Sequence, residues 1–279
     1  MTELVWRPTL SELETAQVRE LLASDEAGVD LPSGGEHLLA VRDGVVGYAH
    51  IDPTGDQLGN QVAELVVHPG HRRQGIGGQM LTAVTEHARP LRIWSHRDHP
   101  GAARLAEKLG LQRVRELYRM GMDFGAEEFA EPTLPDGVRL RAFVPGQDEE
   151  AVVAVNARAF SWHPEQGGLT VDDVRETERE GWFDPAGFFL AVDAQDKVVG
   201  FHWTKVHPDS TGEVYVVGVD PAAQGGGLGK ALTLAGLRHL RGLGLPRVIL
   251  YVEGDNTVAI AVYRKLGFEL LDAGVQYAR

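Results

Sequence analysis

The chain has 279 residues, with 27 Lys and Arg against 40 Asp and Glu, so its formal net charge is −13. Such an acidic chain argues against binding to nucleic acid or anionic lipid, because both require basic protein surface. The absence of Cys excludes disulfides, cysteine nucleophiles and thiolate metal sites. The apolar runs are far shorter than the roughly 18 residues of a membrane span, and the first residues lack the apolar stretch of a signal peptide. We therefore expect a soluble, cytoplasmic protein.

The predicted elements of the first half begin with a helix at residues 12–23, where apolar side chains recur at helical spacing. Two strands follow, at 38–41 and 45–51, on either side of Asp43-Gly44, a strong hairpin signal. The remaining elements are a strand at 62–67, a helix at about 75–89, a strand at 91–94 and a helix at 101–109. A hairpin that leads into a strand–loop–helix unit predicts a mixed α/β domain.

The second half repeats this order, with strands at 188–192, 198–206 and 214–219, a helix at 228–240, a strand at 247–252 and a helix at 257–266. Three sequence blocks also recur, at offsets of 153, 152 and 157 residues, which pair Gly47 with Gly200, Pro69 with Pro221 and Gly110 with Gly267. A linker is expected near residues 130–136, where two Pro and an Asp-Gly turn interrupt any regular element. The chain is therefore predicted to contain two homologous domains, at residues 1–130 and 137–279.

The second half contains an insertion that the first half lacks. Arg7 to Gly47 spans 40 residues, whereas Arg141 to Gly200, the corresponding interval, spans 59. The additional residues lie around 161–168 and 182–185 and are rich in aromatic side chains, Pro and Gly. Because binding residues concentrate on loops, this insertion is a candidate binding lid. The alternative is a surface insertion without a role.

Two glycine-rich loops, at residues 72–77 and 224–229, each lie between a strand and an amphipathic helix. Glycine lets backbone N–H groups turn toward a ligand, and a helix N-terminus carries partial positive charge, so each loop could hold a pyrophosphate. Neither loop has the three-glycine dinucleotide fingerprint or the Gly-Lys-Ser/Thr of a P-loop. Gly-rich turns before helices are also common in proteins that bind no phosphate there.

At these loops the sequence resembles the GNAT superfamily of acetyl-CoA-dependent N-acetyltransferases. The family signature, Arg/Gln-x-x-Gly-x-Gly/Ala, begins at Arg72 and again at Gln224, and Asn256 with Tyr263 matches a second family hallmark. The resemblance covers the whole chain and implies an α/β fold, a tandem repeat of two GNAT-type mixed-sheet domains with flanking helices. It implies acetyl-CoA as cosubstrate. No metal is expected, since the histidines that invite a metal site come from different elements without ligand spacing, namely His163, His202 and His207.

Four strings in the second half resemble the mycothiol synthases, a family of two-domain GNAT proteins; they lie at residues 163–168, 200–208, 212–221 and 250–253. That family acetylates the cysteinyl amine of cysteinyl-glucosaminyl-inositol, so the resemblance implies this small-molecule amine as the acceptor. Two alternatives stay open. The acceptor could be another amine, such as an aminoglycoside, a polyamine or a peptide, or the chain could be a non-catalytic acetyl-CoA sensor. We expect a monomer in either case.

The resemblance also assigns residues to roles. It implies that Glu213 is the general base and that Tyr263 is the general acid on the CoA sulfur. It implies acceptor contacts from Glu165, Lys205, Glu213 and Tyr251. The acetyl-CoA contacts that it implies in the second domain are Val217, Gly218, Val219, Gln224, Gly225, Gly226, Gly227, Leu228, Gly229, Lys230, Asn256, Thr257, Val258, Ala259, Ile260 and Ala261. In the first domain they are Leu65, Val66, Val67, Arg73, Gln74, Gly75, Ile76, Gly77 and Gly78.

The first half lacks the catalytic groups of the second when the repeats are aligned, because the alignment pairs Gln61 with Glu213, His99 with Asn256 and Ala106 with Tyr263. Its glycine loop is intact. The first domain is therefore expected to bind acetyl-CoA without turning it over.

Two further departures from the family concern binding. The family usually has basic residues after Gln224, where this chain has Gly225 and Gly226, so weaker CoA affinity is expected in the second domain. The segment before Glu36 is shortened, and the family's acceptor contact in the first domain is therefore not assigned to a residue.

Overall fold

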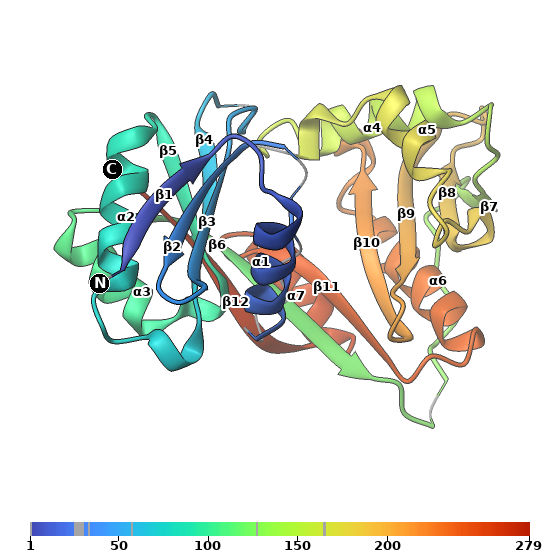
Figure 1. Cartoon of the computed structure of the whole chain (residues 1–279). Helices are drawn as coiled ribbons and strands as arrows, with labels where there is room; N and C mark the ends of the chain where they lie inside the picture. Colours follow the sequence, from blue (N-terminus) through green and yellow to red (C-terminus); the bar gives the residue numbers. More distant parts are fainter. Residues whose placement is uncertain (1, 25–30, 33, 57, 127, 164–165) are drawn as a thin grey trace. The chain divides into compact units, whose positions relative to one another are not determined.

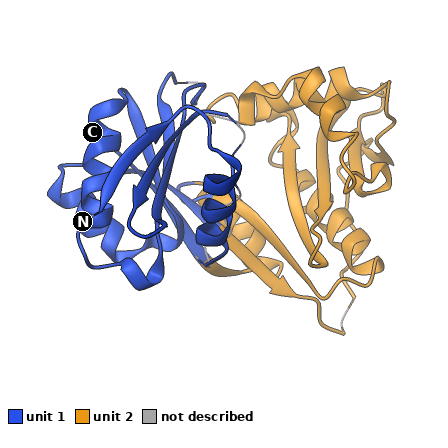
Figure 2. Ribbon diagram, in the orientation of Figure 1, with its two compact units in different colours: residues 1–118, 253–255, 272–279 blue, residues 119–252, 256–271 orange. Residues whose placement is uncertain are grey.

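The chain forms two compact units in a computed structural model that describes residues 2–24, 31–32, 34–56, 58–126, 128–163 and 166–279. Unit 1 comprises Met1–Tyr118, Glu253–Asp255 and Asp272–Arg279, and unit 2 comprises Arg119–Val252 and Asn256–Leu271 (Figure 2). Each unit is a mixed β-sheet with helices packed on it (Figure 1).

Unit 1 has the strand order β1-β2-β3-β4-β5-β12-β6. The bounds are β1 Glu3–Arg7, β2 Glu36–Val41, β3 Val45–Asp52, β4 Gln61–Val67, β5 Leu91–Ser95, β6 Gln112–Asp123 and β12 Glu269–Ala278, with helices α1 Glu12–Ser24, α2 Ile76–His87 and α3 Pro100–Lys108. Alternate residues of β2 face opposite sides of the sheet. Leu39 packs with Val18 and Leu21 of α1, whereas Leu38 packs with Met80 of α2. The sheet is therefore covered on both faces.

Unit 2 has the strand order β12-β6-β11-β10-β9-β8-β7. The bounds are β7 Arg139–Ala142, β8 Phe188–Val192, β9 Val198–Val206, β10 Thr211–Val219 and β11 Arg247–Glu253, with helices α4 Glu149–Ala159, α5 Val171–Thr177, α6 Leu228–Gly242 and α7 Thr257–Lys265. Phe201 and Trp203 of β9 pack with Val152 of α4 and Val174 of α5. His202, which lies between them, faces the other way and contacts the Leu232 carbonyl of α6.

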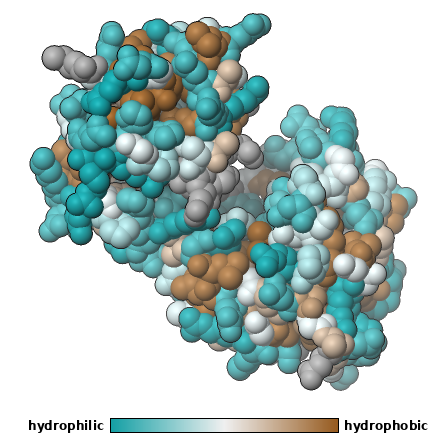
Figure 3. All heavy atoms as spheres, turned by 60° about the horizontal axis from the view of Figure 1, so that its bottom comes forward, coloured by the Kyte–Doolittle hydropathy of each residue, from teal (hydrophilic) through white to brown (hydrophobic). Residues whose placement is uncertain are grey.

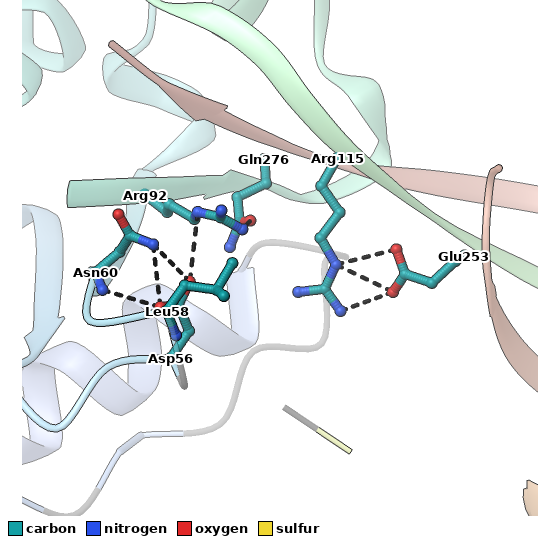
Figure 4. A network of polar contacts seen from close by, with 7 residues as sticks. All are labelled: Asp56, Leu58, Asn60, Arg92, Arg115, Glu253 and Gln276. Atoms are coloured by element: carbon teal, nitrogen blue, oxygen red, sulfur yellow. Dashed lines mark hydrogen bonds and ion pairs between the residues drawn. The ribbon is translucent and has the colours of Figure 1, made fainter. Parts of the chain in front are cut away.

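Segments from the end of the chain complete unit 1. Strand β12 pairs with β5, where Val275 lies opposite Ser95. Glu253 forms a buried ion pair with Arg115, whose Nη2 lies 2.7 Å from Oε1 of the carboxylate (Figure 4). In the same view Arg92 contacts Asp56 and Gln276. Since the compact units are not continuous in sequence, the limits at 1–130 and 137–279 describe the repeat and stay a prediction as domain limits.

Every helix and strand expected from the sequence is present, with ends that differ by a few residues. The elements that the repeat did not predict are β1, β6, β7, α4, α5 and β12. Part of the insertion packs on the sheet of unit 2: the rings of Trp182 and Phe183 each lie 6.0 Å from the ring of Trp203. Its function as a binding lid stays a prediction.

The surface of the molecule mixes polar and apolar side chains. On the face drawn in Figure 3, hydrophobic side chains gather in patches with hydrophilic residues between them. A search of the described residues found no helix that is both long enough and apolar enough to span a membrane.

Candidate functional site

The two central strands of unit 2 are paired over only part of their length. β10 and β11 are parallel, and their register joins Thr211–Val214 to Arg247–Leu250. β10 then continues to Val219, with a β-bulge between Val214 and Val216 that shifts its register against β9. Over Val217–Val219 the backbone is paired to β9, while the register with β11 has already ended. This leaves backbone donors and acceptors on the β11 side of β10 for an extended ligand.

The glycine loop of unit 2 follows directly on β10. The side-chain amide of Gln224 donates to the carbonyl oxygen of Val219 over 3.1 Å, which ties the loop to the end of the strand. Gly225 and Gly227 have φ of +90° and +82°, a region that favours glycine, and no atom lies within 4 Å of where their Cβ atoms would be. Gly227 is the N-cap of the 15-residue helix α6. The loop thus presents open backbone and a helix N-terminus, which is the chemistry that a pyrophosphate requires.

Helix α7 carries the other predicted contacts of acetyl-CoA and the predicted acid. Asn256 is its N-cap, and its Oδ1 accepts a hydrogen bond from the Ala259 backbone N–H over 3.1 Å. Burial raises the pKa of Tyr263 to about 12, so its phenol is protonated at neutral pH. Ile260 and Leu228 are buried in the core, and only their backbone can therefore meet a ligand.

Glu213 lies inside the site on β10. Its side chain is 7% exposed, and its Oε2 lies 2.6 Å from Nε2 of His207. Across the sheet it is opposite Lys205 of β9 and beside Ile249 of β11. Tyr251 lies two residues beyond Ile249 and therefore on the same face of the sheet. The structure thus brings Glu213, Lys205 and Tyr251 to one face, while Glu165 lies outside the described residues.

The ammonium group of Lys205 lies against two aromatic rings. Its Nζ is 4.7 Å from the ring centroid of Trp182 and 5.3 Å from that of Tyr215, within the range of a cation–π interaction. Burial, and then the charge of Glu213, raises the pKa of Tyr215. Sequence reasoning noted the aromatic insertion but missed the contact of Trp182 with Lys205. It also missed the contact of His207 with Glu213, for which the only signal was a spacing of six residues across a turn.

Unit 1 has a cavity of about 840 Å³ at its own glycine loop. The cavity is lined by most of the residues predicted to bind acetyl-CoA there, namely Leu65, Val66, Val67, Arg73, Gly75, Gly77 and Gly78. Three further arginines that sequence reasoning did not single out as contacts also line it, Arg72, Arg97 and Arg104. Of the other predicted residues, Gln74 accepts a hydrogen bond from Arg42, and Ile76 is buried in the core.

The strand registers correct one pairing between the two halves. In unit 1, Val62 lies opposite Asp52 of β3 and beside Arg92 of β5, the places that correspond to those around Glu213. The β-bulge adds one residue to β10 between Val214 and Val216, and the pairing of β4 with β3 has no such shift. The prediction that Gln61 corresponds to Glu213 was therefore wrong by one position. Val62 is the counterpart, and a valine side chain has no acid–base group.

The pairing of the other two residues fits the helix geometry. His99 and Asn256 are both N-caps, of α3 and α7, and the His99 ring accepts from the Gly101 N–H as Asn256 does from Ala259. Ala106 is buried in α3. Glu36, left unassigned above, forms an ion pair with His87 at the end of α2. Within the described parts of the chain, no group of three or more His, Asp or Glu side chains could hold a metal ion.

Comparison with known protein families finds two matches along the chain. Residues 155–268 match the acetyltransferase (GNAT) family, and residues 33–113 match a related acetyltransferase (GNAT) domain. Both glycine loops lie inside the matched regions.

Among curated proteins, the chain is 58% identical to the mycothiol acetyltransferase of Saccharomonospora viridis, over 100% of this chain and 99% of that protein. It is 56% identical to the mycothiol acetyltransferase of Amycolatopsis mediterranei, over 98% of both chains. Among solved structures, a GCN5-related N-acetyltransferase from Sphaerobacter thermophilus matches with a TM-score of 0.78 at 22% identity, over 99% of this chain and 95% of that one. A tandem GNAT protein from the clavulanic acid biosynthesis pathway matches with a TM-score of 0.74 at 21% identity, over 100% and 98%.

Proposed function

The chain belongs to the GNAT acetyltransferases and, within them, to the mycothiol acetyltransferases, and we propose that it acetylates the cysteinyl amine of cysteinyl-glucosaminyl-inositol. The acetyl donor is acetyl-CoA, the cosubstrate of GNAT acetyltransferases. The observation that carries the proposal is the arrangement in unit 2, where a buried carboxylate lies on the strand that leads into an open glycine loop.

The backbone of unit 2 suits the donor. Val217–Val219 would bind the extended pantetheine along the unpaired side of β10, and the loop Gln224–Lys230 with the N-terminus of α6 would bind the pyrophosphate. The open space at Gly225 and Gly227 supports this assignment, since a side chain at either place would stand between the phosphates and the backbone N–H groups. Residues 256–261 at the start of α7 would complete the CoA site.

Acetyl transfer requires that the amine lose a proton as its nitrogen attacks the thioester carbon. The Glu213 carboxylate accepts that proton, while the bond between carbon and sulfur breaks and charge develops on the sulfur. Tyr263 donates to this sulfur. Because burial raises the pKa of Tyr263 to about 12, above the roughly 8.5 of an ordinary thiol, complete proton transfer from the buried phenol is unfavourable. Its main contribution is a hydrogen bond that stabilises the leaving thiolate.

The acceptor is a polyol and needs several directional hydrogen bonds. Lys205 offers donors and Glu213 offers acceptors on one face of the sheet, and Tyr251 adds a hydroxyl from the neighbouring strand. Glu165 is proposed as a further acceptor contact from the insertion. The cation–π contacts of Lys205 fix the ammonium group where the acceptor would meet it.

Unit 1 is proposed to bind acetyl-CoA without chemistry. Its cavity and arginines suit the phosphates of CoA, whereas Val62 and Ala106 stand at the places of the base and the acid. The protein is further proposed to act as a cytoplasmic monomer that binds neither nucleic acid nor membrane, for which the net charge of −13 is the support.

Incubation of the protein with acetyl-CoA and cysteinyl-glucosaminyl-inositol tests the proposal. Mass spectrometry of the product is the appropriate readout, because the acceptor carries a thiol of its own that would confuse an assay for released CoA. We expect one acetyl group on the cysteinyl nitrogen. Faster acetylation of a polyamine or an aminoglycoside would identify a different acceptor. Binding of acetyl-CoA without turnover of any amine would identify a sensor.

A further inference from the structure

His207 contacts the proposed base but has no role in the function proposed above. Its Nε2 lies 2.6 Å from Oε2 of Glu213, and the two side chains are 29% and 7% exposed. His207 therefore lies between a buried carboxylate and the solvent. It follows the last residue of β9, so the hairpin that joins β9 to β10 determines its position.

The short contact restricts where the shared proton can be. An ionised carboxylate can only accept hydrogen bonds, and Glu213 must be ionised to act as a base. The proton between the two side chains then belongs to Nε2 of His207, which donates it to Oε2. This hydrogen bond holds the carboxylate in one orientation. It also leaves Oε1 of Glu213 to accept the proton of the amine.

The backbone holds the turn without help from the imidazole. The N–H of His207 donates to the Thr211 carbonyl over 2.9 Å, and the N–H of Ser210 donates to the His207 carbonyl over 3.0 Å. The Asp209 carboxylate accepts from the N–H of Thr211 over 3.0 Å. Loss of the His207 side chain should therefore leave the hairpin in place, which makes its contact with Glu213 open to experiment.

Other polar groups also face the pair. Lys205 is opposite Glu213 on β9. Tyr215 lies two residues beyond Glu213 on β10, where burial, and then the charge of Glu213, raises the pKa of this phenol. Tyr251 lies on the same sheet face on β11. Hydrogen bonds from Thr211, and to a smaller extent the charge of His207, lower the pKa of Asp209 in the turn. The hydrogen bond to Oε2 of Glu213 comes from His207.

We propose that His207 is a positioning residue that orients the Glu213 carboxylate and aims its free oxygen at the acceptor amine. The inference rests on the proposed function, in which Glu213 is the base. It adds that the base is one half of a His–Glu pair and that the histidine acts only through the glutamate.

The test is the steady-state kinetics of His207→Ala across pH. A hydrogen bond to a charged group is worth roughly a 10–100-fold change, so we expect kcat to fall by that factor while KM for acetyl-CoA changes little. The fall in kcat should persist across the pH range, because the carboxylate loses the donor that orients it. Free imidazole should restore activity to His207→Ala, and His207→Gln, which can still donate, should keep most of it.

Two further variants distinguish a failure of the role of His207 from a failure of the proposed base. In a Glu213→Gln background, His207→Ala should cause no additional loss, because the carboxylate on which it acts is absent. An unchanged kcat for His207→Ala beside an inactive Glu213→Gln would overturn the role of His207 alone. Full activity of Glu213→Gln would overturn the proposed base itself. Ser210→Ala, which changes an exposed side chain of the same turn, is the matched control and should behave as wild type.

Discussion

The two glycine loops of this protein have nearly the same backbone and different side chains. Gly75 and Gly227, the N-caps of α2 and α6, have φ of +84° and +82°. Arg72 and Gln224 each donate from the side chain to a carbonyl oxygen at the end of the preceding strand, over 3.0 and 3.1 Å. Arginine and glutamine therefore perform the same structural task here. The shape of the loop depends on the positions of the glycines and on one side-chain hydrogen bond, and not on charge.

The two loops differ in the charge of the side chains around them. The cavity of unit 1 is lined by four arginines, Arg72, Arg73, Arg97 and Arg104. Under the repeat offsets, their counterparts in the second half of the chain are all uncharged, namely Gln224, Gly225, Gly254 and Ala261. Arginine side chains attract phosphates, and salt weakens this attraction. Unit 1, with its four arginines, is therefore suited to hold CoA firmly. Unit 2, with the proposed acid–base groups, is suited to exchange CoA, as a turnover site must.

Glu213→Gln should have the largest effect, because only unit 2 has a carboxylate at this place. General acid–base groups typically contribute roughly 10²–10⁴-fold, and we expect kcat to fall by that factor. The amide keeps the shape of the side chain, so binding of acetyl-CoA should stay near normal. Rapid-quench measurement of acetyl transfer beside equilibrium binding of CoA would separate the two quantities.

Glu64→Gln is the control for this variant. Glu64 lies on β4, the strand of unit 1 that corresponds to β10, and it has no proposed role in the reaction. Its substitution should leave kcat unchanged. Equal losses in Glu64→Gln and Glu213→Gln would mean that the two units share the chemistry, contrary to the division proposed here.

Tyr263→Phe should have the next largest effect, a fall in kcat of roughly 10²-fold, at the lower end of the range for acid–base groups. The phenol donates a hydrogen bond to the leaving sulfur and does not need to transfer its proton completely. Burial raises the pKa of Tyr263 to about 12; the phenol therefore stays protonated as pH rises, and wild-type activity should show no alkaline fall below about pH 10 from this group. A pH profile of kcat for both proteins checks this, and an alkaline limb near pH 8 that Tyr263→Phe abolishes would contradict it.

Lys205→Ala should affect the acceptor and spare the donor. A buried polar contact left without its partner costs about 1–3 kcal/mol, so kcat/KM for the acceptor should fall by roughly 5–100-fold. Glu165→Ala is expected to act in the same direction. Lys205→Met is a useful companion variant because it keeps the apolar stem against Trp182 and removes the charge. If these variants raised KM for acetyl-CoA and left that for the acceptor unchanged, Lys205 would belong to the donor site.

Local pattern was sufficient to predict the repeated elements, because each helix and strand has its own periodicity. The register between neighbouring strands was harder to predict. The bulge after Val214 adds one residue to β10, and no local signal in the sequence marks it, so counting from Pro221 placed Gln61 where Val62 belongs. A register is a property of two strands, whereas periodicity is a property of one.

Local sequence pattern also could not predict that segments from the end of the chain complete unit 1. β12 has strand-like character, but its pairing with β5 joins residues that are far apart in the sequence, such as Val275 and Ser95. His207 was overlooked as a partner of Glu213 for a similar reason. It follows the end of a strand, and its side chain meets the carboxylate only because the β9–β10 turn folds back.

An exchange of one residue between the loops should have the smallest effect on turnover. Arg73 has φ of +65°, and its counterpart Gly225 has φ of +90°, so Gly225→Arg places arginine where the other loop already accepts it. Exposed charge pairs are worth about 0–1 kcal/mol, and we expect KM for acetyl-CoA to fall by up to about 5-fold and to become more dependent on salt. Arg73→Gly should weaken equilibrium binding at unit 1 by a similar factor and leave KM unchanged, because the reaction is proposed to take place in unit 2. Gly225→Ala is the matched control: it carries the strain of a side chain at positive φ, about 1 kcal/mol, without the charge, and should not lower KM.

If Arg73→Gly altered KM as much as Gly225→Arg does, CoA held by unit 1 would take part in turnover, and the separation of a holding unit from a reacting unit would be wrong.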